Sequence, residues 1–203
     1  MTAAGPALVL LEQHERPTFL AVLTHGAGGT PDTADVLAVR DAARKLGAAT
    51  ALVTQPYRVR GARAPGSAAK QDAAWTELVE VLRRQTARDG VRPPLVQCGR
   101  SNGARVACRT APSTGAAGVI ALAFPLHPPG QPDKSRDAEL RGAGSRVLVI
   151  NGDRDPFGVP EPDGMTDVIV LTGETHALSR HPAAVGDAAA AWLGALPGLL
   201  SIG

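Results

Sequence analysis

Short runs of apolar residues alternate along the chain with longer stretches in which apolar residues recur every three or four positions. The short runs are typical of buried strands, and the longer spacing is typical of helices with one apolar face. Strands are predicted at residues 7–11, 19–23, 50–54, 95–98, 118–123, 146–150 and 167–171. Helices are predicted at residues 31–46, 68–84 and 182–196, and a further helix begins at residue 104. We expect the first strand to open a hairpin and residues 197–203 to be loosely held.

This alternation of strands and helices indicates an α/β protein. Short strands that are apolar throughout are typical of a doubly wound, mainly parallel sheet with helices on both faces. Neither an internal repeat nor an interdomain linker interrupts the pattern, so residues 1–203 are expected to form a single domain. In such sheets, ligands bind at the carboxyl ends of the strands. Polar residues that directly follow a strand are therefore the candidates for function.

Composition and charge exclude several classes of partner. The chain is 44% hydrophobic and 20% charged, which is typical of a globular domain. Because aromatic residues make up only 3% and the net charge is +2, no nucleic-acid partner is expected. Neither a membrane-spanning run nor a signal-peptide pattern is found, so we expect no membrane partner and a cytoplasmic location. Cys98 and Cys108 fit buried residues in a reducing compartment better than a disulfide or a metal site.

A serine follows the strand at residues 95–98 within a glycine-rich turn. Gly99, Ser101 and Gly103 have the spacing G-x-S-x-G, and a helix begins directly after them. In this setting a strained backbone lifts the serine hydroxyl above the edge of the sheet, where a histidine can reach it. The flanking residues must be small because the strand and the helix nearly touch. The alternative is a glycine-rich turn with an incidental serine, because so short a motif also occurs by chance.

The next strand ends offer the two partners that a serine nucleophile needs. A serine hydroxyl attacks only when a neighbouring base takes its proton, and a third group must orient that base. Asp155 follows the strand at residues 146–150, and His176 follows the strand at residues 167–171. The order serine, aspartate, histidine is found on doubly wound hydrolase sheets. We therefore expect Ser101, Asp155 and His176 to meet at one edge of the sheet.

Both partners have competitors in the sequence. Asp153 competes with Asp155 for the carboxylate role, but it also fits a turn residue that binds its own backbone. Gly152 permits a bend after which Asp155 reaches over the sheet edge, so Asp155 is preferred. His127, in a proline-rich loop, is the main competitor of His176 as the base, and it fits the wall of a pocket better.

Backbone N–H groups are needed to hold the negative oxygen that forms during acyl transfer. One donor is expected from Asn102, directly after the serine, and the other from Ala27 or Gly26 in the glycine turn after residues 19–23. The arginines in loop 58–63 either attract an anionic substrate or simply face solvent. The residues expected to border the substrate pocket are His25, Tyr57, His127 and Phe157. His25 is also expected to hold the glycine turn in shape.

Taken together, these motifs resemble the alpha/beta-hydrolase superfamily over nearly the whole chain. The chain is similar to its small, lidless members related to dienelactone hydrolase and to the testis-expressed/KANL3-type hydrolase-like domain. The resemblance implies an alpha/beta-hydrolase fold without a cap domain, with Ser101 as nucleophile, Asp155 as acid and His176 as base. Dienelactone hydrolases have cysteine in place of Ser101, so their substrate is not carried over. The resemblance is carried by residues 24–28, 98–105, 124–130, 151–158 and 174–176.

The sequence therefore predicts a serine hydrolase that cleaves a carboxylic ester or thioester through an acyl-enzyme. Its expected partner is a small-molecule acyl substrate, and no cofactor or metal is expected. One alternative is an acyltransferase, in which an alcohol takes the acyl group. Such an enzyme differs from a hydrolase only in that it excludes water from the acyl-enzyme. The other is a binding scaffold with a hydrolase fold, although a scaffold has no physical need for Ser101, Asp155 and His176 together. No pattern indicates the oligomeric state.

Overall fold

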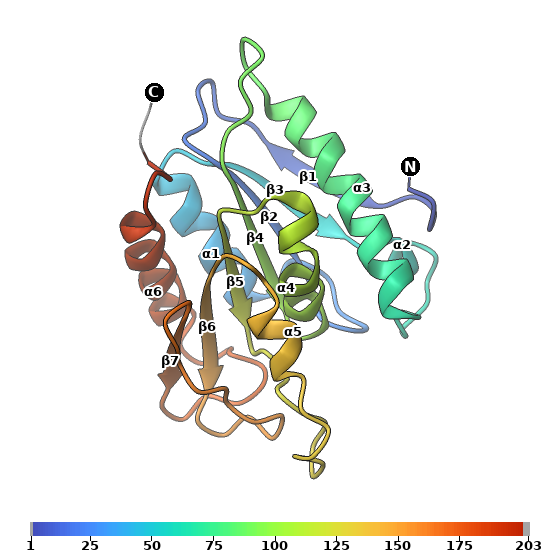
Figure 1. Cartoon of the computed structure of the whole chain (residues 1–203), viewed down its shortest axis with the longest axis vertical. Coiled ribbons are helices and arrows are strands. Elements are labelled where there is room, and N and C mark those ends of the chain that lie inside the picture. Colours follow the sequence, from blue (N-terminus) through green and yellow to red (C-terminus); the bar gives the residue numbers. More distant parts are fainter. Residues whose placement is uncertain (1, 201–203) are drawn as a thin grey trace.

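A seven-stranded sheet with helices on both faces forms the centre of the molecule (Figure 1). The computed structural model describes residues 2–200. The strands follow the order β1-β3-β2-β4-β5-β6-β7 across the sheet. Only β1 runs antiparallel to its neighbour, so the predicted doubly wound, mainly parallel sheet is confirmed. The strands are β1 (Leu8–Glu12), β2 (Leu20–Thr24), β3 (Ala49–Thr54), β4 (Leu95–Arg100), β5 (Gly118–Leu122), β6 (Arg146–Gly152) and β7 (Thr166–Leu171).

The position of β1 differs from the prediction. The expected hairpin of the first two strands is wrong, because β1 pairs with β3, and β2 lies between β3 and β4. Every residue of β2 is buried, whereas Leu8 and Leu10 of β1 are 66% and 57% exposed. A strand that is apolar on both faces needs covered neighbours on each side, so β2 takes a central position and β1 an edge.

The long helices lie where the apolar spacing places them, and two short helices were not predicted. The helices are α1 (Ala34–Lys45), α2 (Pro56–Val59), α3 (Ala68–Thr86), α4 (Asn102–Thr114), α5 (Asp137–Arg141) and α6 (Pro182–Ala195). α2 and α5 span about one turn each, which is too short to show a helical period. α5 lies on the segment between β5 and β6, where Glu139 forms ion pairs with Arg105 and Arg109 of α4. α5 is therefore packed against α4, and within residues 2–200 the segment between β5 and β6 holds no further helix that could form a cap domain.

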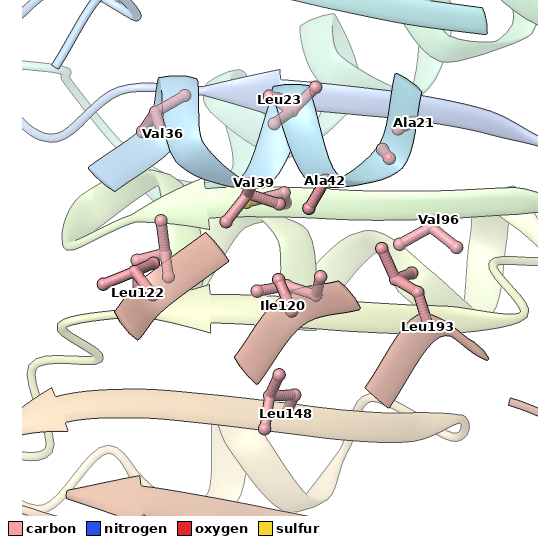
Figure 2. Close-up of a cluster of buried hydrophobic side chains, with 14 of the residues drawn as sticks. Ala21, Leu23, Val36, Val39, Ala42, Val96, Ile120, Leu122, Leu148 and Leu193 are labelled. Atoms are coloured by element: carbon pink, nitrogen blue, oxygen red, sulfur yellow. The ribbon is translucent and has the colours of Figure 1, made fainter. Parts of the chain in front are cut away.

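Two apolar cores flank the sheet. On one face, α1 and α6 pack on the strands, and Figure 2 shows Val36 and Val39 of α1 and Leu193 of α6 in one cluster with Ile120 and Leu148 of the sheet. On the other face, α3 and α4 pack on the alternate strand residues (Figure 1). Successive strand residues point to opposite faces, so β2, β4, β5 and β6 are mostly apolar on both faces, with buried Gln97 of β4 as an exception. This is why they appear in the sequence as short, mostly apolar runs.

The carboxyl-terminal segment is better packed than predicted. Leu199 is 1% exposed and belongs to the core formed by α1 and α6, and Leu200 packs against that core. The expectation of a loose tail is therefore wrong for this part, and residues 201–203 lie outside the described residues. None of the helices within residues 2–200 has the length and apolar character needed to cross a membrane.

Candidate active site

Ser101 occupies the turn between β4 and α4 in a conformation that few residues tolerate. Its backbone angles are φ 52° and ψ −112°. A β-carbon on Gly99 would lie 2.2 Å from the carbonyl carbon of Gly103, and one on Gly103 would lie 2.6 Å from the carbonyl oxygen of His25. Only glycine fits at both positions, which explains the G-x-S-x-G spacing. Strain of this kind costs about 1–3 kcal/mol and is stored mainly at functional sites.

The structure brings together the three residues that the sequence singled out. The Nε2 atom of His176 lies 2.8 Å from the Oγ atom of Ser101, and its Nδ1 atom lies 2.8 Å from the Oδ2 atom of Asp155. The Asp155 side chain is fully buried, and 21% of the His176 side chain is exposed. With Asp155 ionised, Nδ1 of His176 carries the proton and Nε2 is free to accept the proton of the serine hydroxyl.

Neighbouring loops hold this chain of hydrogen bonds in place. The backbone N–H of Phe157 donates to Oδ1 of Asp155 (2.9 Å), and the Phe157 ring stacks against His176 with centroids 4.2 Å apart. Buried Glu174 accepts the backbone N–H groups of Arg180 and His181, which ties the loop around His176 to the start of α6. The carboxylate and the base therefore sit on braced loops.

Of the two candidate carboxylates, Asp155 contacts the histidine and Asp153 does not. Asp153 is exposed, and its Oδ1 atom accepts the backbone N–H of Gly173 (2.8 Å). Gly152, the last residue of β6, must be glycine because a β-carbon there would lie 2.2 Å from the carbonyl oxygen of Glu174. Asp153 thus ties together the loops after β6 and β7, and Asp155 orients the base.

An ion pair that the sequence did not reveal connects the serine turn to the histidine loop. Arg100, the residue before Ser101, donates from Nε to Oδ2 of Asp35 (3.0 Å) and from Nη2 to the carbonyl oxygen of His176 (2.8 Å). Arg100 and Asp35 side chains are 18% and 1% exposed. Asp35 looks in the sequence like an ordinary acidic residue in the first turn of a helix, so no local signal marks this pair.

The glycine turn after β2 lies directly against the serine. A β-carbon on Gly26 would lie 3.2 Å from the β-carbon of Ser101. Within residues 2–200, the backbone N–H groups of Ala27 and Asn102 donate to no protein acceptor. The carbonyl of Gly26 is occupied, because it accepts from Gly29 and from the His25 ring. The Asn102 side chain is held in place by its bond to Oε1 of Gln71 (2.7 Å).

His25 supports this turn and does not border a pocket. It is fully buried, and burial lowers the pKa of its imidazole below the ordinary value. The neutral ring donates from Nδ1 to the Gly26 carbonyl (2.8 Å) and accepts at Nε2 from the backbone N–H of Gln55 (3.0 Å). Because both ring nitrogens bind backbone groups, the ring holds the turn in place. The expectation that His25 borders the substrate pocket is therefore wrong.

Of the other predicted pocket residues, Tyr57 and Phe157 lie beside the site, and His127 braces a loop. Tyr57 lines a cavity of about 570 Å³ beside the serine turn. Phe157 contacts the His176 ring, as described above. His127 points its Nε2 atom at Gly158 and binds the Pro128 carbonyl through Nδ1 (2.9 Å), so it braces the Asp155 loop. It takes no part in the hydrogen bonds of Ser101.

The arginine loop is mostly engaged with the backbone. Arg58 donates to the carbonyls of Gly29 (3.0 Å) and Ala62 (3.0 Å), and Arg60 donates to the carbonyl of Ala4. Among residues 2–200, no three histidine, cysteine, aspartate or glutamate side chains gather so that they could hold a metal ion. The chemistry available at this edge of the sheet is therefore that of a hydroxyl, an imidazole, a carboxylate and free N–H groups.

Known structures share this architecture over almost their full length. An alpha/beta serine hydrolase homologue from Coxiella burnetii is 15% identical, with a TM-score of 0.74, and the match covers 95% of this chain and 94% of that one. A dienelactone hydrolase from Anabaena variabilis is 17% identical, with a TM-score of 0.73 and coverage of 96% and 94%. A serine hydrolase without a lid from Xanthomonas campestris is 20% identical, with a TM-score of 0.69 and coverage of 97% and 95%.

The family assignment comes from the sequence itself. No curated protein matches the chain. Residues 17–169 match the family model described as an alpha/beta hydrolase domain. This match spans the serine turn and the Asp155 loop, and the structural neighbours agree with it in fold. The chain therefore belongs to the alpha/beta hydrolase family.

Proposed function

We propose that this protein is a serine hydrolase that cleaves a carboxylic ester or thioester through an acyl-enzyme on Ser101. The observation that carries the proposal is the unbroken chain of hydrogen bonds from Ser101 through His176 to buried Asp155, both links being 2.8 Å long. A serine with a base in reach, and a base oriented by a carboxylate, is the arrangement that nucleophilic catalysis requires.

In the proposed reaction, Ser101 Oγ attacks the acyl carbon while Nε2 of His176 takes the hydroxyl proton. Asp155 stabilises the imidazolium that forms and keeps its own charge. The N–H groups of Asn102 and Ala27 hold the oxyanion, with Gly26 as the other candidate from the turn, because hydrogen-bond donors fixed in advance stabilise the charge as it develops. His176 then protonates the leaving oxygen or sulfur. Water, activated by the same histidine, releases the acyl group.

Two observations favour hydrolysis over the alternatives. A binding scaffold gains nothing from the strained backbone of Ser101, whose φ of 52° lowers stability. A transferase must exclude water from its acyl-enzyme. Here no cap covers the sheet edge, and 21% of the His176 side chain remains exposed to solvent. Water therefore has access to the group that would activate it.

A fluorophosphonate probe tests the nucleophile directly. Wild-type protein should be labelled, and Ser101→Ala protein should not. The carboxylate is tested by a matched pair of variants two residues apart, assayed on p-nitrophenyl acetate. Asp155→Asn should lower kcat about ten-thousand-fold, because the histidine then loses its orientation and its tautomer. Asp153→Asn removes a carboxylate of the same loop that does not touch His176, and it should lower kcat less than about threefold.

Two results would overturn the proposal. One is equal labelling of wild type and Ser101→Ala by the probe. The other is an equal loss of kcat in the two aspartate variants, which would mean that the loop fold matters and the carboxylate does not.

A further inference from the structure

The cavity of about 570 Å³ lies at the carboxyl end of β3, between α2, α3 and the amino-terminal turn. Its walls are mostly apolar, and Val53, Trp75 and Leu78 supply their larger side chains. The Trp75 indole N–H is already bound to the Gln97 side chain, so the ring presents only apolar surface. The volume falls within the range of about 300–1,000 Å³ that is typical of small-molecule pockets.

The charged groups that line this cavity are all cationic. Lys70 at the start of α3 and Arg60 after α2 line it, and no aspartate or glutamate within residues 2–200 does so. Neither cation forms an ion pair with a carboxylate in the described part of the chain. Glu77 lies outside the lining, where it accepts the Ala3 N–H (2.8 Å) and holds the amino-terminal turn as a wall.

Two lining residues join the cavity to the proposed oxyanion site. The Tyr57 hydroxyl lies 3.5 Å from the Gly26 carbonyl oxygen, and Oε1 of Gln71 accepts from the Asn102 side chain (2.7 Å). Gln71 also donates to the carbonyls of Gly66 (3.2 Å) and Ser67 (3.3 Å), so its orientation is fixed. A substrate whose carbonyl oxygen sits at the Asn102 N–H therefore lies next to the cavity.

The topology decides which half of a substrate faces the cavity. His176 and Asp155 approach Ser101 from β7 and β6, on one side of β4, whereas the cavity lies beside β3, on the other side. The leaving group must be near His176, because His176 gives it a proton. The acyl part of the substrate then extends away from His176 and toward the cavity.

We propose that this cavity binds the acyl chain of the substrate and selects an apolar chain that ends in a carboxylate. The apolar walls take the body of the chain, and Lys70 and Arg60 neutralise its terminal charge. This inference rests on the proposed hydrolase function, and it names the substrate class as the monoester of a dicarboxylic acid.

Two p-nitrophenyl esters of equal chain length test the charge preference. The kcat/KM of mono-p-nitrophenyl octanedioate is compared with that of p-nitrophenyl octanoate, and wild type should favour the octanedioate. Lys70→Gln should lower this ratio about fivefold, the effect of losing one solvent-accessible ion pair of about 1 kcal/mol. Lys45→Gln, a matched change at the end of α1 and outside the lining, should leave the ratio unchanged.

The apolar walls are tested by filling the cavity. Ala73 is an exposed residue of α3 that lines it, so Ala73→Phe adds a ring there without disturbing the buried core. This variant should lower kcat/KM for the octanoate ester about tenfold more than for the acetate ester. A ratio unchanged by Lys70→Gln, or equal losses for the two esters in Ala73→Phe, would overturn the inference.

A binding experiment separates this inference from the proposed function. In the double variant Ser101→Ala/Trp192→Phe, Trp75 is the only tryptophan, because the chain contains two. Octanedioate should then change its fluorescence saturably, and Lys70→Gln should weaken the binding. Binding without probe labelling of the wild type would contradict the hydrolase function alone. Labelling and acetate turnover without binding or discrimination would contradict the acyl site alone.

Discussion

Replacing Arg100 by methionine should destabilise the protein and also displace the catalytic base, and these two effects can be separated. Arg100 is the ion-pair partner of Asp35, whose side chain is 1% exposed, and the Oδ1 atom of Asp35 has no hydrogen-bond partner within residues 2–200. Removing the guanidinium leaves this carboxylate buried and uncompensated. The free energy of unfolding should therefore fall by about 3–5 kcal/mol.

The double variant Arg100→Met/Asp35→Leu isolates the second effect. Replacing both partners of a buried ion pair by apolar residues is close to neutral, so its stability should return to within about 1.5 kcal/mol of wild type. The carbonyl of His176 has still lost the bond that Arg100 donates at 2.8 Å. A base misplaced by about 1 Å costs roughly a hundredfold in rate, so kcat should remain about ten- to hundredfold below wild type.

Two measurements check this prediction on the same protein samples. Urea unfolding gives the free energy of unfolding, and hydrolysis of p-nitrophenyl acetate together with the rate of fluorophosphonate labelling reports on the base. Conditions in which every variant is fully folded keep the two readouts independent. A loss of less than about 1 kcal/mol in Arg100→Met would refute the role of the buried carboxylate. Recovery of kcat in the double variant would refute the role of Arg100 in positioning His176.

Three further predictions concern stored strain and buried titratable groups. The free energy of unfolding of Ser101→Gly should exceed that of Ser101→Ala by about 1 kcal/mol, because glycine tolerates a φ of 52°. Equal urea midpoints for the two variants would contradict the strain. Burial raises the pKa of Cys108 to about 12 and that of Cys98 well above its ordinary value, so both thiols should resist Ellman's reagent at pH 8 until the chain unfolds. Rapid reaction of the folded protein would refute their burial. Burial lowers the pKa of His25 in the folded state, so the unfolded chain takes up a proton that the folded chain does not. Stability should therefore decline as the pH falls below about 6.5, and urea unfolding of His25→Gln should show a smaller dependence on pH over that range.

Several features of the site could be predicted because they depend on neighbouring residues in the chain or on a geometry that all parallel sheets share. The serine turn is one, since Gly99 and Gly103 are required by contacts within a single strand-turn-helix unit. The meeting of Ser101, Asp155 and His176 is another, because parallel strands place their carboxyl ends at one edge of the sheet. The choice of Asp155 over Asp153 rested on an expected bend at Gly152, and in the structure it is Asp155 that contacts His176, whereas Asp153 binds the Gly173 backbone.

Other features could not be predicted because they join residues far apart in the chain. The pair of Arg100 and Asp35 spans 65 residues, and its burial depends on how α1 packs beside β4. The role of His25 as a support for the glycine turn depends on the Gln55 backbone, which β3 brings alongside. α2 and α5 could not be predicted because a single helical turn is too short to show a hydrophobic period.

The sequence alone determined the order of the strands and the long helices, the mainly parallel sheet and the three residues that meet at its edge. These follow from local hydrophobic spacing and from the geometry that all parallel sheets share. Only the tertiary structure decided the edge position of β1, the packing of Leu199, the brace on His176 and the cationic lining of the cavity. Each of these depends on which distant surfaces come into contact, and a buried charge or a packed side chain is stabilised only by the partner that the complete fold brings to it.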